Sequence, residues 1–312
     1  MFGIIKSSKK LVTHDGSFHT DDIFAAATFS LLLEKKGENF EIIRTRNPEI
    51  IKSADYVFDV GGVYDAKSNR FDHHQIGGAG HRQGGASKLE NGIEYSSFGL
   101  VWKKFGKDLT GSDDVVKLVD KRLVCPIDAH DNGFDLVEKK YEVSPFLIQD
   151  FFRVMRPTWQ ETDSKIDEMF LKSVLIAKEI LSREIIHVKD TIISNQSITS
   201  IYNSVKDKKI LVFDKNYSSA EILGELREVL FVVYPRKTDG SWGAKAVRDD
   251  SKGFKNRKNF PKSWAGLRGE ELQKISGVSD VVFCHRGLFL AIAKSKEGAI
   301  KLAELALLEP SS

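Results

Sequence analysis

A helical segment framed by short apolar runs, within roughly the first 60 residues, constrains the fold of this chain most strongly. Residues 11–13, 40–44 and 56–60 are apolar runs of strand length, and residues 23–34 repeat apolar side chains at helical spacing before Gly37. The dipeptide Asn47-Pro48 is expected to interrupt the chain between the last two strands. Strands joined through a helix pair in the same direction. The sequence therefore predicts an α/β fold with a largely parallel sheet at this end.

The remaining segments predict a second domain. A chain of 312 residues is long enough for about two domains. Helices are expected over residues 96–105 and 113–123, and a longer one over about 163–186. Beyond it, short apolar runs and a closing helix are expected at residues 210–213, 230–234, 243–247, 281–283, 289–292 and 296–308. We therefore predict one domain over residues 1–190 and a second α/β domain over residues 191–312.

Composition narrows the class of protein. Hydrophobic residues make up 41% of the chain and charged residues 29%, which is typical of a globular protein and excludes collagen-like and disordered chains. Cys125 and Cys284 stand far apart and form no CxxC pair, which favours a reducing compartment. No run approaches the roughly 20 apolar residues of a membrane span, and the first ten residues do not resemble a signal peptide. We expect a cytoplasmic protein without a membrane partner.

Positive charge is concentrated in one segment. The net charge is only +3, yet residues 231–270 contain ten Lys or Arg against four Asp or Glu. Such a segment favours a surface that faces a polyanion, although runs of cations are as often simply solvated. Both interpretations are open on the charge alone.

Histidine and aspartate gather in four short segments within about 120 residues, at predicted strand ends or loops. They are residues 14–22, Asp59, residues 72–75 and residues 128–133. Carboxylates and imidazoles without thiols suit Mn²⁺, Mg²⁺, Fe²⁺ or Zn²⁺. A pair of metal ions needs about six to eight ligands, at least one of them shared. Each segment alone could be a cap or a turn, especially at Asn132-Gly133, but four together favour a metal site.

The same segments resemble the melanocyte-proliferating-gene family, which is related to the DHH phosphoesterases. The resemblance is carried, in order, by THDGSFHTDD at 13–22, IRTR at 43–46, VFDVGG at 57–62, RFDHHQ at 70–75, SSFGLVW at 96–102, IDAHDNG at 127–133, SWAGLR at 263–268, SGV at 276–278, FCH at 283–285 and EGA at 297–299. The match is collinear over nearly the whole chain. It implies a DHH-like, metal-binding catalytic domain at the N-terminal end, followed by an α/β substrate-binding domain.

The resemblance also implies two divalent metal ions. Their ligands would be His14, His19, Asp21, Asp59, His73 and Asp131. His14 and His19 would hold one ion, Asp59 would bridge, and the other three would hold the second ion. His19 stands where the DHH superfamily has an aspartate. A neutral imidazole nitrogen in place of a carboxylate removes one negative charge from the site. This change favours Mn²⁺ over Mg²⁺ as the bound ion, and Mg²⁺ is the alternative.

Further roles follow from the same resemblance. Asp59, His74 and Asp72 would be the catalytic group, with His74 facing the substrate phosphate and Asp72 orienting an imidazole. Asp22, Asp128 and His130 are left open. Phosphate-binding residues of the second domain would be Lys245, Arg248, Arg257, Arg268 and His285.

The implied activity is that of a 3′–5′ exonuclease acting on RNA or short oligonucleotides. One alternative is a hydrolase of a small phosphoanhydride or dinucleotide, which a closed pocket would favour. Another is a metal-stabilised nucleic-acid-binding module without turnover, although a structural site needs no open coordination positions. The family has also been described as metal-dependent protein hydrolases. That activity has no support in this sequence, which contains neither HExxH nor a nucleophile elbow.

Overall fold

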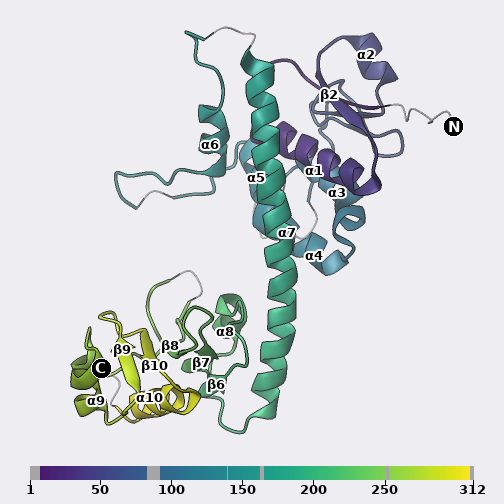
Figure 1. Cartoon of the computed structure of the whole chain (residues 1–312). Helices are drawn as coiled ribbons and strands as arrows, with labels where there is room; N and C mark the ends of the chain where they lie inside the picture. The colour runs from purple at the N-terminus through teal and green to yellow at the C-terminus, as the bar shows by residue number, and fades with distance from the viewer. Residues whose placement is uncertain (1–7, 83–91, 139, 162–164, 251–252, 310–312) are drawn as a thin grey trace, which may run out of the picture. The chain divides into compact units, whose positions relative to one another are not determined.

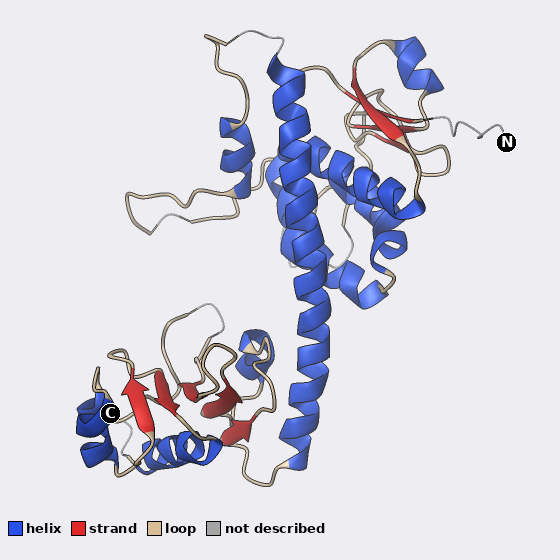
Figure 2. Ribbon diagram, in the orientation of Figure 1, coloured by secondary structure: helices blue, strands red, loops and turns tan. Residues whose placement is uncertain are grey.

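A computed structural model describes residues 8–82, 92–138, 140–161, 165–250 and 253–309 (Figures 1 and 2). The chain forms two compact units, Met1–Val188 and Lys189–Ser312. Within the described residues, no helix is both long and apolar enough to cross a lipid bilayer.

The first unit contains a five-stranded sheet and its covering helices. In chain order the elements are β1 (Lys9–Thr13), α1 (Thr20–Lys36), β2 (Phe40–Arg44), α2 (Pro48–Ser53), β3 (Tyr56–Phe58), β4 (Tyr64–Asp65), β5 (Arg70–Phe71), α3 (Ser97–Thr110), α4 (Asp113–Val119), the π-helical turn η1 (Asp120–Val124), α5 (Cys125–Asp131) and α6 (Ile148–Val154). The strand order is β2-β1-β3-β5-β4, and every pairing is parallel except that of β4 with β5. The predicted α/β organisation is confirmed, in a mixed sheet.

Helices cover both faces of this sheet. On one face, the ring of Phe29 in α1 lies 5.6 Å from that of Phe58 in β3 and 5.6 Å from that of Phe105 in α3. On the other face, Val12 and Val57 form a buried cluster with residues from around α2. Because helices cover both faces, a ligand site is expected at the edge of the sheet where the parallel strands have their carboxyl ends.

The second unit also combines a sheet with helices. Its elements after α7 (Ile166–Ser204) are β6 (Ile210–Val212), α8 (Ala220–Glu225), β7 (Phe231–Pro235), β8 (Trp242–Ala246), the 3₁₀ turn η3 (Lys262–Trp264), α9 (Gly269–Ser276), β9 (Val281–Cys284), β10 (Leu290–Ala293) and α10 (Lys296–Leu308). The strand order is β6-β7-β8-β10-β9, and only β6 and β7 pair in parallel.

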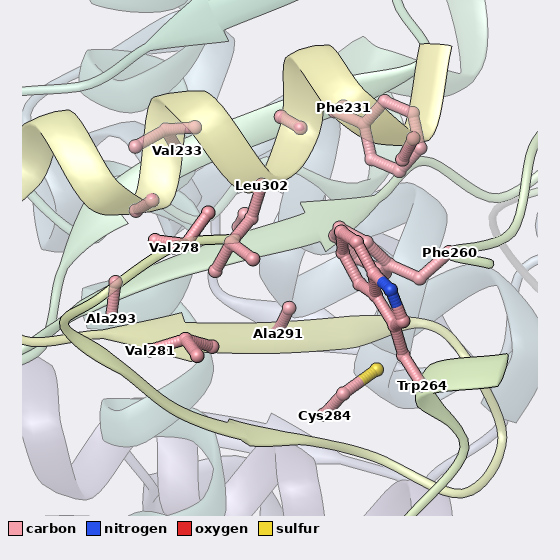
Figure 3. Packing of buried hydrophobic residues seen from close by; sticks show 14 of the residues in the cluster. Phe231, Val233, Phe260, Trp264, Val278, Val281, Cys284, Ala291, Ala293 and Leu302 are labelled. Carbon is pink, nitrogen blue, oxygen red and sulfur yellow. The ribbon is translucent and has the colours of Figure 1, made fainter. Parts of the chain in front are cut away.

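The core of the second unit lies between α10 and the sheet. Leu302 of α10 belongs to the same buried cluster as Phe231 of β7 and Ala291 of β10 (Figure 3). The rings of Phe260 and Trp264 stack in that cluster at a centroid separation of 6.1 Å. The opposite face of β6 and β7 is covered by a separate buried cluster, which includes Ile198 of α7 and Leu223 of α8.

The long helix extends beyond its predicted end. It was expected to finish at Ile186, but α7 runs on to Ser204, over 39 residues. No glycine or proline occurs between Ile166 and Ser204, so nothing in the chain ends the helix earlier. Residues 163–164 of the expected helix lie outside the described residues. The domain boundary expected at 190/191 falls inside this helix.

Asn47-Pro48 separates β2 from β3 as expected, and it does so by starting α2, because the Asn47 side chain accepts a hydrogen bond from the Glu49 amide at 2.9 Å and proline is well suited to the first helical turn. Another expectation about local structure is wrong. Residues 128–131 are not a loop but the end of α5. The turn signal Asn132-Gly133 ends that helix, with Gly133 at a φ of 78°.

Candidate metal centre

Three neighbouring parallel strands end at the same edge of the first sheet. His14 directly follows β1, Asp59 follows β3, and the Asp72-His73-His74 segment follows β5. Strands β1 and β5 both flank β3, so these segments meet. The first turn of α1 contributes Asp21 and Asp22, and His19 caps that helix. The last residue of α5, Asp131, completes the group.

The six predicted metal ligands lie in one cluster with Asp59 at its centre. His14 Nε2 lies 3.2 Å from Asp59 Oδ2, and His73 Nε2 lies 3.2 Å from Asp59 Oδ1. His73 Nε2 is also 3.5 Å from Asp131 Oδ2 and 3.8 Å from Asp21 Oδ2. His19 lies within 4.8 Å of two sets of these ligands, one with His14 and Asp59 and the other with Asp21 and Asp131. The Asp59 carboxylate therefore lies next to two groups of ligands, one that contains His14 and one that contains His73.

The cluster has the charge that a cation would balance. Both carboxylate oxygens of Asp21 are buried without a donor within hydrogen-bond distance among the described residues. Burial and neighbouring carboxylates raise the pKa of Asp21 well above its usual value, and burial likewise raises the pKa of Asp22 and Asp131. Buried carboxylates without donors are costly unless a cation or metal ion pairs with them. The residues present therefore fit divalent metal ions.

Asp59 differs from the other carboxylates. Burial opposes its ionisation, but hydrogen bonds from His14 and His73 outweigh burial and lower the pKa of Asp59. Its backbone is left-handed, with a φ of 56°, a conformation that aspartate adopts more readily than most residues. The Ser97 hydroxyl lies 3.2 Å from Asp59 Oδ1 and 2.9 Å from the Phe71 carbonyl. Ser97 was not among the predicted site residues, and only its place in the SSFGLVW motif pointed to it.

Asp72 holds the histidine pair in place. Its Oδ1 accepts hydrogen bonds from the His73 amide at 2.8 Å and is 2.8 Å from His74 Nδ1, and its Oδ2 accepts the Gly62 amide at 2.5 Å. The hydrogen bond to Asp72 raises the pKa of His74. Because Nδ1 faces Asp72 and the His74 side chain is 61% exposed, Nε2 is available to a ligand.

The structure separates the three residues that were left open. Asp22 Oδ1 accepts the His19 amide at 2.9 Å, and its Oδ2 lies 3.2 Å from His14 Nε2, so Asp22 supports two predicted ligands. Asp128 is buried away from the cluster and accepts hydrogen bonds from Ser96 Oγ at 2.6 Å and Arg82 Nε at 2.7 Å. The hydrogen bond between Asp128 and Ser96 therefore connects α5 with the start of α3. His130 is exposed.

Two cavities border the cluster and share His19. One, of about 310 Å³, is lined by Asp21 and Asp131 together with other residues of α5 and residues that belong to α6 or follow it. The other, of about 470 Å³, is lined by His14, Asp59 and His74. Substrate could therefore reach the predicted ligands from two sides.

The predicted phosphate-binding residues of the second unit occupy different settings. Arg257 does not fit that role, because its guanidinium donates to the carbonyls of Leu226, Val229 and Leu223 at 2.6, 2.8 and 2.7 Å around the end of α8. The sequence alone could not show that the side chain of Arg257 hydrogen-bonds to backbone carbonyls. Lys245 and Arg248 line one cavity of about 120 Å³.

The other two predicted residues contact aromatic rings. The Arg268 guanidinium lies 4.4 Å from the centre of the Phe283 ring. The ring of His285 lies 4.3 Å from that of Phe289, and its Nδ1 accepts the Gly287 amide at 3.0 Å. Both side chains leave donors that could bind phosphate.

The metal-free protein is expected to lose stability as pH rises. Burial opposes the charge on His14, but hydrogen bonds to Asp22 and Asp59 raise its pKa from 6.5 to about 9. A raised pKa in the folded state stabilises the fold below the unfolded value, and this stabilisation is lost as pH rises through the folded value. We expect the free energy of unfolding in EDTA to fall by up to about 3 kcal/mol between about pH 6.5 and 9.

Denaturant unfolding at a series of pH values measures this effect. Added Mn²⁺ should abolish the fall, because metal ions bind the deprotonated ligands. The His14→Gln variant should show a shallower fall without metal. A stability that is constant or rises over this pH range would contradict the charge distribution described here.

Comparison with known proteins assigns the family. A family model described as MYG1_exonuc, uncharacterised protein family UPF0160, matches residues 10–307. The chain is 30% identical to the MYG1 protein YER156C of Saccharomyces cerevisiae, over 97% of this chain and 96% of that protein. It is 29% identical to the human MYG1 exonuclease, over 97% of this chain and 86% of that protein.

Among solved structures, RecJ of Thermus thermophilus in complex with Mn²⁺ matches with 13% identity, covering 97% of this chain and 53% of that one. Its TM-score of 0.29 is too low to establish a shared fold. The assignment therefore rests on the match in sequence, which extends over nearly all of the chain and includes every residue of the cluster around Asp59. The chain belongs to the MYG1_exonuc family.

Proposed function

We propose that this chain is a divalent-metal-dependent phosphodiesterase, and specifically a 3′–5′ exonuclease that acts on RNA or short oligonucleotides. The observation that carries the proposal is the convergence of six ligand-type side chains at one sheet edge, with Asp59 shared between two groups. Membership of the family supports a hydrolase, because the human relative is named an exonuclease. The RNA substrate and the direction of digestion are the finer parts of the proposal.

The ligand set suits two cations. His14, His19 and Asp59 would hold one, and Asp21, Asp59, His73 and Asp131 the other. Two divalent cations would supply the Lewis acidity that makes water nucleophilic at neutral pH and would neutralise charge on phosphate oxygens. With two imidazoles and one shared carboxylate, the first group is softer than an all-oxygen site, which favours Mn²⁺ over Mg²⁺.

Residues around the cluster would bind and orient the phosphodiester. His74 lines the cavity that also contains His14 and Asp59, and its Nε2 would donate to a phosphate oxygen when the imidazole is protonated. Asp72 fixes the orientation of that imidazole by its bond to Nδ1. Asp22 and Ser97 would hold His14 and Asp59 in position, and neither is among the described residues that line the two cavities.

The second unit would bind the nucleic-acid strand through Lys245, Arg248, Arg268 and His285. Support comes from Lys245 and Arg248 lining one cavity, and from the planar donors of Arg268 beside an aromatic ring. Arginine next to an aromatic side chain is a common arrangement for binding bases and phosphates. Arg257 is left out of this group because both of its terminal nitrogens donate to backbone carbonyls around α8.

Digestion of labelled RNA tests the proposal. A single-stranded RNA labelled at its 5′ end would be incubated with Mn²⁺, with Mg²⁺ and with EDTA, beside a DNA of the same sequence. A 3′–5′ exonuclease produces labelled products that shorten one nucleotide at a time, faster with Mn²⁺ and not at all with EDTA. Immediate release of a labelled mononucleotide would reverse the direction, and intact RNA with both metals would refute the activity.

A further inference from the structure

The cavity of about 310 Å³ beside Asp21 has a second wall that the predicted site does not include. Its lining combines the ligands Asp21 and Asp131 with Arg153 and Arg156, together with His130 and Gln149. The lining also includes Asp150 of α6, which pairs with Arg153, so α6 and the residues after it supply both hydrogen-bond donors and one carboxylate. Two guanidinium groups beside a predicted metal centre are suited to an anionic ligand rather than to a metal ion.

Arg156 is the residue of this wall that points most strongly to a ligand. It follows α6 and precedes Pro157, and its side chain is half-buried. Its guanidinium lies 5.9 Å from the centre of the Phe18 ring. Its Nε is buried and has no hydrogen-bond partner among the described residues. Within the part of the chain that the structure describes, no hydrogen bond or ion pair engages the terminal nitrogens of this guanidinium, so they could donate to an acceptor that enters the cavity.

Arg153 reinforces the same wall from a more exposed position. Its side chain is 62% exposed and lies 3.2 Å from Asp150 Oδ1, three residues earlier on α6. An exposed pair of this kind is weak and leaves other donors of the guanidinium free. Among the described residues, the second cavity is lined by a single arginine, Arg46, which is as exposed as Arg153, and it has no counterpart of the half-buried Arg156. The two sides of the cluster are therefore chemically different.

We propose that this cavity is a subsite for the phosphate group next to the scissile one, with Arg156 as its principal ligand and Arg153 assisting at the rim. The proposal rests on the proposed phosphodiesterase function and specifies its substrate. A strand with at least two phosphate groups would occupy both the metal centre and this subsite. A diester with a single phosphate group would occupy the metal centre alone.

Two substrates separate these cases. The p-nitrophenyl ester of thymidine 5′-phosphate contains one phosphodiester, and an RNA hexanucleotide has neighbouring phosphates. Arg156→Gln should lower kcat/KM for the hexanucleotide by about ten- to a hundredfold, as expected for the loss of a charge-assisted hydrogen bond. The same variant should hydrolyse the p-nitrophenyl ester within about twofold of wild type. Arg156→Lys, which keeps the charge, should recover part of the hexanucleotide activity.

A matched control variant and a binding measurement distinguish the loss of phosphate binding from misfolding and from a loss of catalytic activity. Arg183→Gln changes an exposed arginine of α7 that does not line this cavity and should behave as wild type on both substrates. In EDTA, binding of a fluorescent hexanucleotide should depend less steeply on salt for Arg156→Gln, by about 0.7 in the slope of log affinity against log salt. Thermal unfolding shows whether each variant is folded.

Each outcome bears on one proposal. Equal losses on both substrates, or no loss on either, would overturn the subsite. Wild-type protein that hydrolyses neither substrate with Mn²⁺ would refute the phosphodiesterase, and the salt slope in EDTA would still decide whether Arg156 contacts a phosphate. An unchanged slope would then overturn the subsite as well.

Discussion

Asp59→Asn is expected to lower kcat by more than about a hundredfold, equivalent to about 2.7 kcal/mol, while the fold is kept. Among the described residues, Asp59 is the one carboxylate that lies close to both His14 and His73, through its two different oxygens. An amide has the same shape but lacks the charge and the second acceptor that two cations would share. Asparagine also tolerates the left-handed backbone at this position, which has a φ of 56°, so backbone strain does not complicate the result.

The measurement is steady-state hydrolysis at saturating Mn²⁺, with thermal unfolding of the same samples. Asp108→Asn, at an exposed position of α3, is the matched control and should retain full activity. If Asp59→Asn keeps a tenth or more of the wild-type rate, Asp59 does not bridge two metal ions.

Gly99→Ala is expected to destabilise the protein by about 3 kcal/mol, because the added methyl group overpacks a buried site. A Cβ at this position would lie well inside 3.0 Å of the Asp128 carboxylate, a separation that real Cβ atoms essentially never show. That carboxylate cannot withdraw easily, since it accepts hydrogen bonds from the Gly99 amide at 3.1 Å and from Ser96 Oγ at 2.6 Å, and it pairs with Arg82.

This substitution should also weaken metal binding. Asp128 and Asp131 lie three residues apart on α5, so a shift of α5 against α3 moves a predicted ligand. Thermal unfolding should show a melting temperature lowered by about 6–12 °C, and titration with Mn²⁺ should show a lower affinity. Asp108→Ala, on the exposed side of α3, should change stability by less than about 0.5 kcal/mol. A Gly99→Ala variant as stable as wild type would show that this contact does not constrain α5.

The arrangement of the site could be predicted wherever the ligands follow strands. Parallel strands end at a common edge, so His14 and Asp59 were expected to meet once residues 11–13 and 56–60 were identified as strands. His19 and Asp21 were expected as ligands only from the resemblance, and the structure places them at that edge because the helix after β1 begins at Thr20. The ordered motifs of the family supplied the remaining ligands, including Asp131 on a segment that was expected to be a loop.

What could not be predicted depends on tertiary contacts. Asp128 and Asp131 belong to one motif, yet Asp128 is a buried partner of Arg82 and only Asp131 reaches the cluster. Sequence pattern does not distinguish two aspartates three residues apart on a helix, because the difference lies in what packs against each.

The roles of the arginine side chains were equally hard to predict from the sequence. Counting charge over residues 231–270 drew attention to Arg257, whose terminal nitrogens donate to carbonyls around α8. The same count passed over Arg156, which lies outside the basic segment and lines the cavity beside Asp21. The availability of a guanidinium is set by its acceptors in the folded protein, and local composition does not contain that information.

Anomalous diffraction from crystals soaked in Mn²⁺ tests the central claim most directly. Two peaks are predicted within the cluster, one bound by His14, His19 and Asp59, and the other by Asp21, Asp59, His73 and Asp131. Their separation should be about 3.5–4 Å, as in other two-metal sites. Peaks at separate sites, or a single peak that does not contact Asp59, would contradict a two-metal centre at this sheet edge.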